Sequence, residues 1–192
     1  MDKKVFADRI RKNLIEIKDK IICFFPNYSC YAINLLNWYS EQITKNKIIF
    51  NSKKNDDNIK KNKNVEFVRR KRTEVYWSQF GENVGSEFNG DHFCVVLYES
   101  YYTAIVAPIS SSKPNDGKWK TKEKLMVKIG KIEDLPRKKP EAYVCLNHIR
   151  SVSKKRLNTY KDIKTGKYIN LRLNNEQMNI IDNTLIKICK KK

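Results

Sequence analysis

The stretch from Glu74 to Ser112, EVYWSQFGENVGSEFNGDHFCVVLYESYYTAIVAPISSS, decides the fold of this 192-residue chain. It holds β-branched and aromatic runs separated by a polar, glycine-bearing loop and then by a tight turn. This pattern predicts strand, loop, strand, turn and strand. The loop gathers Ser86, Glu87, Asp91 and His92 within a few positions. Reactive side chains on a loop held by a rigid sheet are a common arrangement for a catalytic or binding site.

The charge of the chain indicates a polyanionic partner. Lys and Arg number 40 against 21 Asp and Glu, which gives a formal net charge of +19. Such an excess favours encounter with RNA or DNA. The alternatives are another acidic partner or a compositional bias in which many of the lysines are simply solvated.

The cysteines and the N-terminal sequence bear on cofactors and compartment. The five cysteines are scattered and contain no CxxC pair, which argues against a zinc site and a disulfide framework. We therefore expect no metal, no cofactor and a reducing, cytoplasmic setting. The N-terminus is charged and periodic, unlike a signal peptide. Its longest apolar run, IICFF, is far below the roughly 20 residues that span a bilayer, so we expect no membrane association.

Three parts follow one another along the chain. Apolar residues at three- and four-residue spacing predict helices over residues 3–25 and about 28–47, separated by Pro26, so residues 1–50 form a helical hairpin. Two helices bury too little surface alone, and this hairpin must pack on the next domain, on a second subunit or on another protein. Residues 51–70 are rich in Lys, Asn and Asp and predict a flexible basic linker.

The third part, residues 71–192, is predicted to be mainly β. Strands are expected at 74–80, 92–99, 102–108, 124–130 and 142–146, and residues 148–152 predict a short strand or a helical turn. Asn174 is expected to cap a last helix over residues 175–189. The sequence thus predicts an α+β protein: a small barrel-like sheet with a C-terminal helix, preceded by the helical hairpin.

Five motifs in order resemble the MazF/PemK toxin family: VYW at 75–77, VGSE at 84–87, VVL at 95–97, TAIVAPIS at 103–110 and LNHIRSVSKKRL at 146–157. The resemblance covers the chain from about residue 71 to its end. It implies an SH3-like small β-barrel of the MazF/PemK/CcdB type, usually a homodimer. It also implies the toxin of a type II toxin–antitoxin system, a metal-independent endoribonuclease that cuts single-stranded RNA at short sequences and is held inactive by a cognate antitoxin.

The resemblance also suggests site residues. Gly85, Ser86 and Glu87 match the Gly-Ser-Glu element of the family, and Thr103 matches a threonine that opens the third strand. His92 stands where the family has its catalytic arginine. A histidine can serve as acid or base near neutral pH, but it lacks the permanent charge and the bidentate fork of arginine. His92 is therefore either the acid–base group of a variant enzyme or the mark of a weakened or inactive site.

Our hypothesis for the reaction gives these residues roles. His92 acts as base or acid with Glu87 as its partner, and Ser86 and Thr103 donate hydrogen bonds to the scissile phosphate. The candidates for the missing positive charge are Arg72 and Arg150. Trp77 is expected to stack on a base, and Lys155 to contact the RNA. His148 is expected to face solvent or a dimer partner, and it receives no role.

The sequence is also compatible with a different function. The protein could be a nucleic-acid-binding or protein-binding module that kept the barrel and lost catalysis, as does a related barrel family that poisons DNA gyrase without cutting anything. The hairpin at residues 1–50 could cover the RNA groove, extend a dimer interface or bind the antitoxin.

Overall fold

The computed structural model describes residues 2–23, 30–44, 69–81, 83, 86–111, 124–135 and 141–190. The chain divides into two compact units, Met1–Asn64 and Val65–Lys192.

The first unit is helical in its described parts. Helix α1 spans Lys3–Cys23, and a second helix covers residues 30–44, which confirms the two predicted helices with slightly shorter bounds. Helix α1 leaves its apolar side chains exposed, among them Phe6, Ile10 and Leu14. No helix in the described ranges is long and apolar enough to cross a membrane. Pro26 and residues 51–68 lie outside the described residues, so the hairpin and the linker stay predictions.

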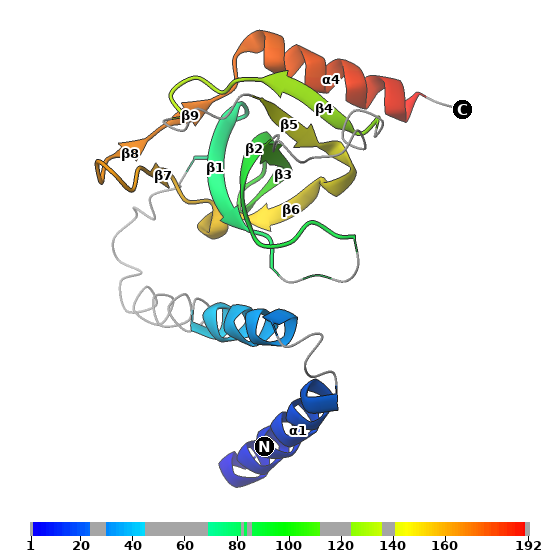
Figure 1. Ribbon diagram of the computed structural model, residues 1–192, viewed down its shortest axis with the longest axis vertical. Coiled ribbons are helices and arrows are strands. Elements are labelled where there is room, and N and C mark those ends of the chain that lie inside the picture. Colours follow the sequence, from blue (N-terminus) through cyan, green and yellow to red (C-terminus); the bar gives the residue numbers. More distant parts are fainter. Residues whose placement is uncertain are drawn as a thin grey trace. The chain divides into compact units, whose positions relative to one another are not determined.

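The second unit is built on an antiparallel sheet that curls into a half-barrel (Figure 1). Its strands run in the order β4-β5-β3-β2-β1-β9, and β6 also pairs with β3. The strands are β1 (Glu74–Gln79), β2 (Asp91–Glu99), β3 (Thr103–Ser111), β4 (Met126–Gly130), β5 (Ala142–Cys145), β6 (Arg150–Ser153) and β9 (Leu171–Arg172). This arrangement confirms the predicted α+β class and the five predicted strands.

Shorter elements complete the unit. The 3-10 helices η1 (Leu146–His148) and η2 (Lys154–Arg156) precede and follow β6. Strands β7 (Tyr160–Lys161) and β8 (Tyr168–Ile169) form a separate hairpin, and α4 (Asn175–Cys189) ends the unit.

Both faces of the sheet carry a core because successive side chains of a strand point to opposite sides. One core includes Val95, Ala107, Val144, Met178 and Ile181, and so lies on the face that α4 covers. We call it the helix-side core. The other core lies on the opposite face and includes Tyr76, Phe80, Cys94, Val96, Ala104, Val106, Val152 and Leu157. We call it the site-side core.

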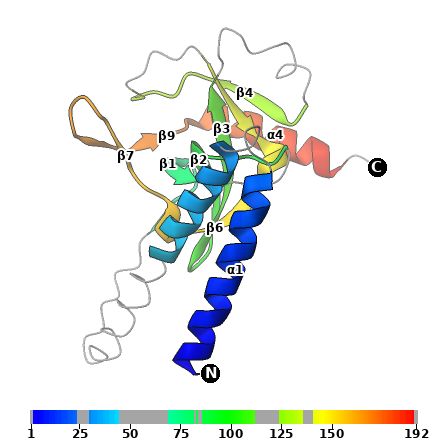
Figure 2. The same ribbon diagram turned by 60° about the horizontal axis from the view of Figure 1, so that its bottom comes forward.

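Helix α4 is fixed beside β4 (Figures 1 and 2). The Asn174 side chain accepts a hydrogen bond from the Gln177 amide, and the Gln177 side chain accepts one from the Asn174 amide, so the predicted cap is a reciprocal capping box. The buried Gln177 amide group also donates to the carbonyls of Ile129 and Lys131, both at 2.8 Å. These two bonds join the first turn of the helix to the end of β4.

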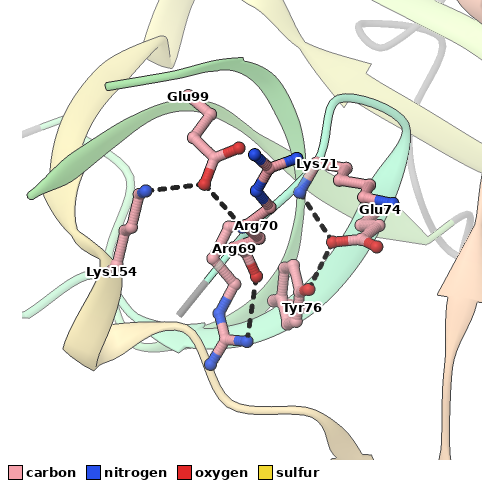
Figure 3. A network of polar contacts seen from close by, with 7 residues as sticks. All are labelled: Arg69, Arg70, Lys71, Glu74, Tyr76, Glu99 and Lys154. Atoms are coloured by element: carbon pink, nitrogen blue, oxygen red, sulfur yellow. Dashed lines mark hydrogen bonds and ion pairs between the residues drawn. The ribbon is translucent and has the colours of Figure 1, made fainter. Parts of the chain in front are cut away.

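A polar network fastens the segment that enters β1 (Figure 3). The Glu99 carboxylate accepts from the Arg70 backbone amide at 2.9 Å and from the Lys154 ammonium at 2.6 Å. Nearby, Glu74 accepts from the Lys71 amide and from the Tyr76 hydroxyl. The network thereby joins the entering segment to β1, to the end of β2 and to η2.

Candidate functional site

The site centres on His92, near the start of β2. His92 lies opposite Ser78 of β1 in the antiparallel register. On the other side, Phe93 lies opposite Ile109, so one step along the ladder brings His92 beside Ser110 of β3. Directly opposed residues of antiparallel strands project from the same face. His92 therefore lies between two serines, on the face of the site-side core.

The hydroxyl of Ser78 is a buried polar group beside His92. Ser78 is 0% exposed, and its Oγ has no hydrogen-bond partner among the described residues. A buried hydroxyl without a partner is uncommon in a folded protein.

The loop between β1 and β2 is closed at its base. The Phe80 amide donates to the Gly90 carbonyl and the Gly90 amide donates to the Gly81 carbonyl, both at 2.8 Å. Gly81 and Gly90 have φ values of 93° and 74°, a conformation that glycine adopts without cost. Asn83 then donates to the carbonyls of Phe80 and Phe88, at 3.1 and 2.9 Å. The loop is thereby held so that Phe88 returns over the sheet.

The ring of Phe88 contacts both histidines of the chain. Its centroid lies 4.4 Å from that of His92 and 5.4 Å from that of His148. Phe88 also contacts Phe80 at 5.5 Å and packs against the site-side core. His148, at the end of η1, is half-buried and contacts this cluster, while the expectation that it faces solvent or a dimer partner stays a prediction.

Two arginines reach the end of β1. Arg150, at the start of β6, donates to the Phe80 carbonyl at 3.3 Å, with its guanidinium carbon 5.7 Å from the Phe80 ring centroid. Arg156 of η2 donates to the neighbouring Gln79 carbonyl. Both arginines are half-buried. Two permanent positive charges therefore lie on consecutive carbonyls at the end of the strand that pairs with His92.

The pKa of His148 is changed by burial and by two neighbouring charged groups. Burial lowers the pKa of His148 below its usual value of 6.5, and the positive charge of Arg150 lowers it further. The carboxylate of Glu87 acts in the opposite direction. Glu87, His148 and Arg150 therefore belong to one cluster, with Glu87 exposed at its edge. We expected Glu87 to partner His92, and the described electrostatic contact of Glu87 is with His148.

The structure does not bring Thr103 to His92. Thr103 pairs with Ser153 beside the β2–β3 turn, at the opposite end of β3 from Ser110. The strand rise of about 3.3 Å per residue separates these two positions by roughly 23 Å. The hydroxyl that the sheet places next to His92 on β3 is that of Ser110.

Arg72 also lies at the far end of the sheet. It donates to the Leu97 carbonyl at 2.9 Å and to both carboxylate oxygens of Asp182 at 2.5 and 2.6 Å. It therefore ties the segment before β1 to α4, and it does not supply charge to the His92 cluster. Of the two arginines considered from the sequence, Arg150 is the one in the cluster.

The other sequence candidates are spread around this region. Ser86 is exposed in a turn of the loop, and Gly85 lies outside the described residues. Trp77 is half-buried and contacts Phe93 at 4.8 Å, so it projects from the face opposite to His92. Lys155 is exposed on η2, next to Arg156. In the described ranges, no three or more His, Cys, Asp or Glu side chains are grouped so that they could hold a metal ion.

Several residues of the cluster were missed by sequence reasoning, namely Ser110, His148, Phe88 and Arg156. A usable signal existed for His148 and Arg156, because both belong to the same motif as Arg150, LNHIRSVSKKRL. For Ser110 the signal was the register of β2 against β3, which the sequence alone does not give.

Comparison with known protein families agrees with this fold. A family model described as the PemK-like, MazF-like toxin of type II toxin–antitoxin systems matches residues 71–189, which cover β1, the cluster and α4. The chain therefore belongs to the PemK-like, MazF-like toxin family, as the motifs indicated. Membership of a type II system implies an antitoxin partner. No curated protein sequence is significantly similar to the chain.

Proposed function

We propose that this toxin is a metal-independent endoribonuclease that cuts single-stranded RNA at short sequences. The observation that carries the proposal is the placement of His92 in one cluster with Arg150 and Arg156, at the end of β1. This arrangement supplies a titratable group and permanent positive charge around one position. The net charge of +19 favours a polyanionic substrate.

The chemistry needs few groups because RNA carries its own nucleophile. The 2′-hydroxyl attacks the adjacent phosphorus, the bond to the 5′-oxygen breaks, and the products are a 2′,3′-cyclic phosphate and a 5′-hydroxyl. The protein must accept one proton, donate another and stabilise the negative charge on the phosphate oxygens. His92 can serve in proton transfer. Arg150 and Arg156 supply the charge that a histidine cannot, and Ser110 supplies a hydrogen-bond donor.

The proposal accounts for a histidine at the position of the family arginine. A single arginine at position 92 would combine charge and hydrogen bonding, whereas this chain divides those tasks. His92 carries out proton transfer, and Arg150 and Arg156 provide the permanent positive charge. We also propose that the active form is a homodimer in the cytoplasm and that the antitoxin blocks the site.

The test is cleavage of end-labelled single-stranded RNA by the purified full chain in EDTA. We expect fragments with 2′,3′-cyclic phosphate ends, and a loss of about a hundredfold or more in the His92→Ala variant. Arg150→Gln should also lower the rate, while Tyr168→Phe, at an exposed position of the separate β7–β8 hairpin, serves as a control. Binding of RNA without any cleavage would overturn the proposal and support a binding module.

A further inference from the structure

We propose that His148 is a second catalytic acid–base group, and that His148 and His92 divide the two proton transfers of RNA cleavage between them. This inference rests on the proposed ribonuclease function and assigns a further catalytic role within the same site.

The geometry that carries it is the contact of two imidazoles with the one phenyl ring of Phe88. His92 comes from β2 and His148 from η1, and each ring contacts the same phenyl ring, at 4.4 and 5.4 Å between centroids. The sum of these distances is the upper limit for the separation of the two imidazoles. Phe88 is itself fixed by Phe80 and by the Asn83 side chain. Both imidazoles are therefore held on one small, rigid support.

In-line displacement at phosphorus requires two proton-transfer groups, one on each side of the phosphate. The 2′-oxygen enters opposite the departing 5′-oxygen, so one group must serve the entering oxygen and the other the leaving oxygen. Two imidazoles that contact one phenyl ring can supply both groups. Arg150 acts electrostatically on His148, and Arg150 and Arg156 donate to the Phe80 and Gln79 carbonyls at the end of β1, where they can supply positive charge to the phosphate.

The surroundings of His148 assign the two roles. Phe88 from the loop buries it, Arg150 from β6 disfavours its protonation, and Glu87 from the loop only partly opposes this. The pKa of His148 therefore lies below its usual value, and the ring is neutral at neutral pH. A neutral imidazole is suited to be the base. His92 is then assigned the role of the acid.

The proton and bond changes balance. His148 accepts the proton of the 2′-hydroxyl while the 2′-oxygen forms its bond to phosphorus. The phosphorus–5′-oxygen bond breaks, and the leaving oxygen takes the proton of His92. The enzyme finishes with His148 protonated and His92 neutral, and exchange with solvent restores the starting state.

The experiment measures single-turnover cleavage of labelled RNA in EDTA between about pH 5 and 9. We expect a bell-shaped profile for the wild type. His148→Gln should lose the acidic limb and at least about a hundredfold in rate, and His92→Gln should lose the alkaline limb. Asn147→Ala changes the exposed neighbour on η1 and should keep both limbs.

A second substrate separates the acid from the base. An RNA in which sulfur replaces the bridging 5′-oxygen has a leaving group that needs no proton. The defect of His92→Gln should largely disappear on this substrate, and the defect of His148→Gln should remain. Because the chain has only two histidines, NMR titration of the imidazole signals gives the pKa of His148 independently of activity, and we expect a value below 6.5.

The outcomes distinguish this inference from the proposed function. If the wild type does not cut RNA in EDTA, the ribonuclease proposal fails and this inference fails with it. If the wild type cuts but His148→Gln keeps the rate and the acidic limb, only the role of His148 is overturned. Circular dichroism and binding of an RNA with a 2′-deoxy residue at the cut site show whether each variant is folded and binds normally. A folded His148→Gln variant that loses rate through binding alone also overturns the assignment.

Discussion

Lys154 places its ammonium group 2.6 Å from the carboxylate of Glu99, and its side chain is only 6% exposed. The two residues come from η2 and from the end of β2, and the same carboxylate also accepts the Arg70 amide. This ion pair therefore holds η2, which carries Arg156, against the sheet that carries His92.

Glu99→Gln should destabilise the second unit by roughly 2–4 kcal/mol, because it removes the negative charge that the buried Lys154 ammonium contacts at 2.6 Å. The measurement is urea unfolding near neutral pH. The matched control is Glu141→Gln, which removes the exposed ion pair between Lys128 and Glu141 and should cost less than about 1 kcal/mol. Equal effects of the two substitutions would show that Lys154 is not effectively buried.

The same pair predicts a pH dependence. The hydrogen bond from Lys154, followed by that from the Arg70 amide, lowers the pKa of Glu99 in the folded state. A lowered carboxyl pKa stabilises the protein above the unfolded pKa of about 4.3, and this stabilisation is lost as pH falls through the folded pKa. The stability difference between the wild type and Glu99→Gln should thus shrink below about pH 4. A difference that stays constant on acidification would contradict this.

Arg72→Gln should affect stability and leave catalysis unchanged. Its contacts are with Leu97 and Asp182, at the end of the sheet away from His92, and its ion pair is partly exposed. We expect a loss of about 1 kcal/mol and an unchanged single-turnover rate on RNA. A double-mutant cycle with Asp182→Asn would isolate the pair. A large loss of cleavage with no loss of stability would restore the original assignment of Arg72 to RNA binding.

Ser110 and Thr103 provide a direct test of the strand register. Ser110→Ala should slow cleavage by about tenfold, the effect expected for one lost hydrogen bond to the reacting phosphate. Thr103→Ala removes a hydroxyl from the same strand at its other end and should leave the rate unchanged. The reverse ranking of these two variants would place the site at the β2–β3 turn.

Gly90→Ala should have a larger effect on the rate of RNA cleavage than on the free energy of unfolding. Gly90 has a φ of +74° and nothing within 4 Å of an added Cβ, so the cost is conformational strain of about 1 kcal/mol. The strain falls on the loop that holds Phe88 beside both histidines, and the cleavage rate should drop. Gly166→Ala, with a φ of +68° and equally open surroundings, is the matched control in the β7–β8 hairpin. It should lose similar stability and keep full activity.

The helices and strands could be predicted wherever a pattern of neighbouring residues controls the local structure. Alternation of apolar residues located β1 and β2 within a residue or so, and Asn174 with Gln177 marked the start of α4. These signals act over a few residues, through side-chain direction along a strand and through backbone groups at a helix end. Arg150 was recognised because it belongs to the motif LNHIRSVSKKRL, and His92 because it stands where the family has its arginine.

The grouping of side chains was decided only by the tertiary structure. Arg72 was assigned to the site from its closeness in sequence, yet Asp182, far along the chain, holds it at the other end of the sheet. His148 and Arg156 join His92 because β6 pairs with β3 and the half-barrel curls back toward β1. The sequence by itself determined the strands, the helices, the family and the basic character. Register and curvature depend on long-range pairing that no local pattern encodes, and they alone place two histidines on Phe88 and two arginines at the end of β1.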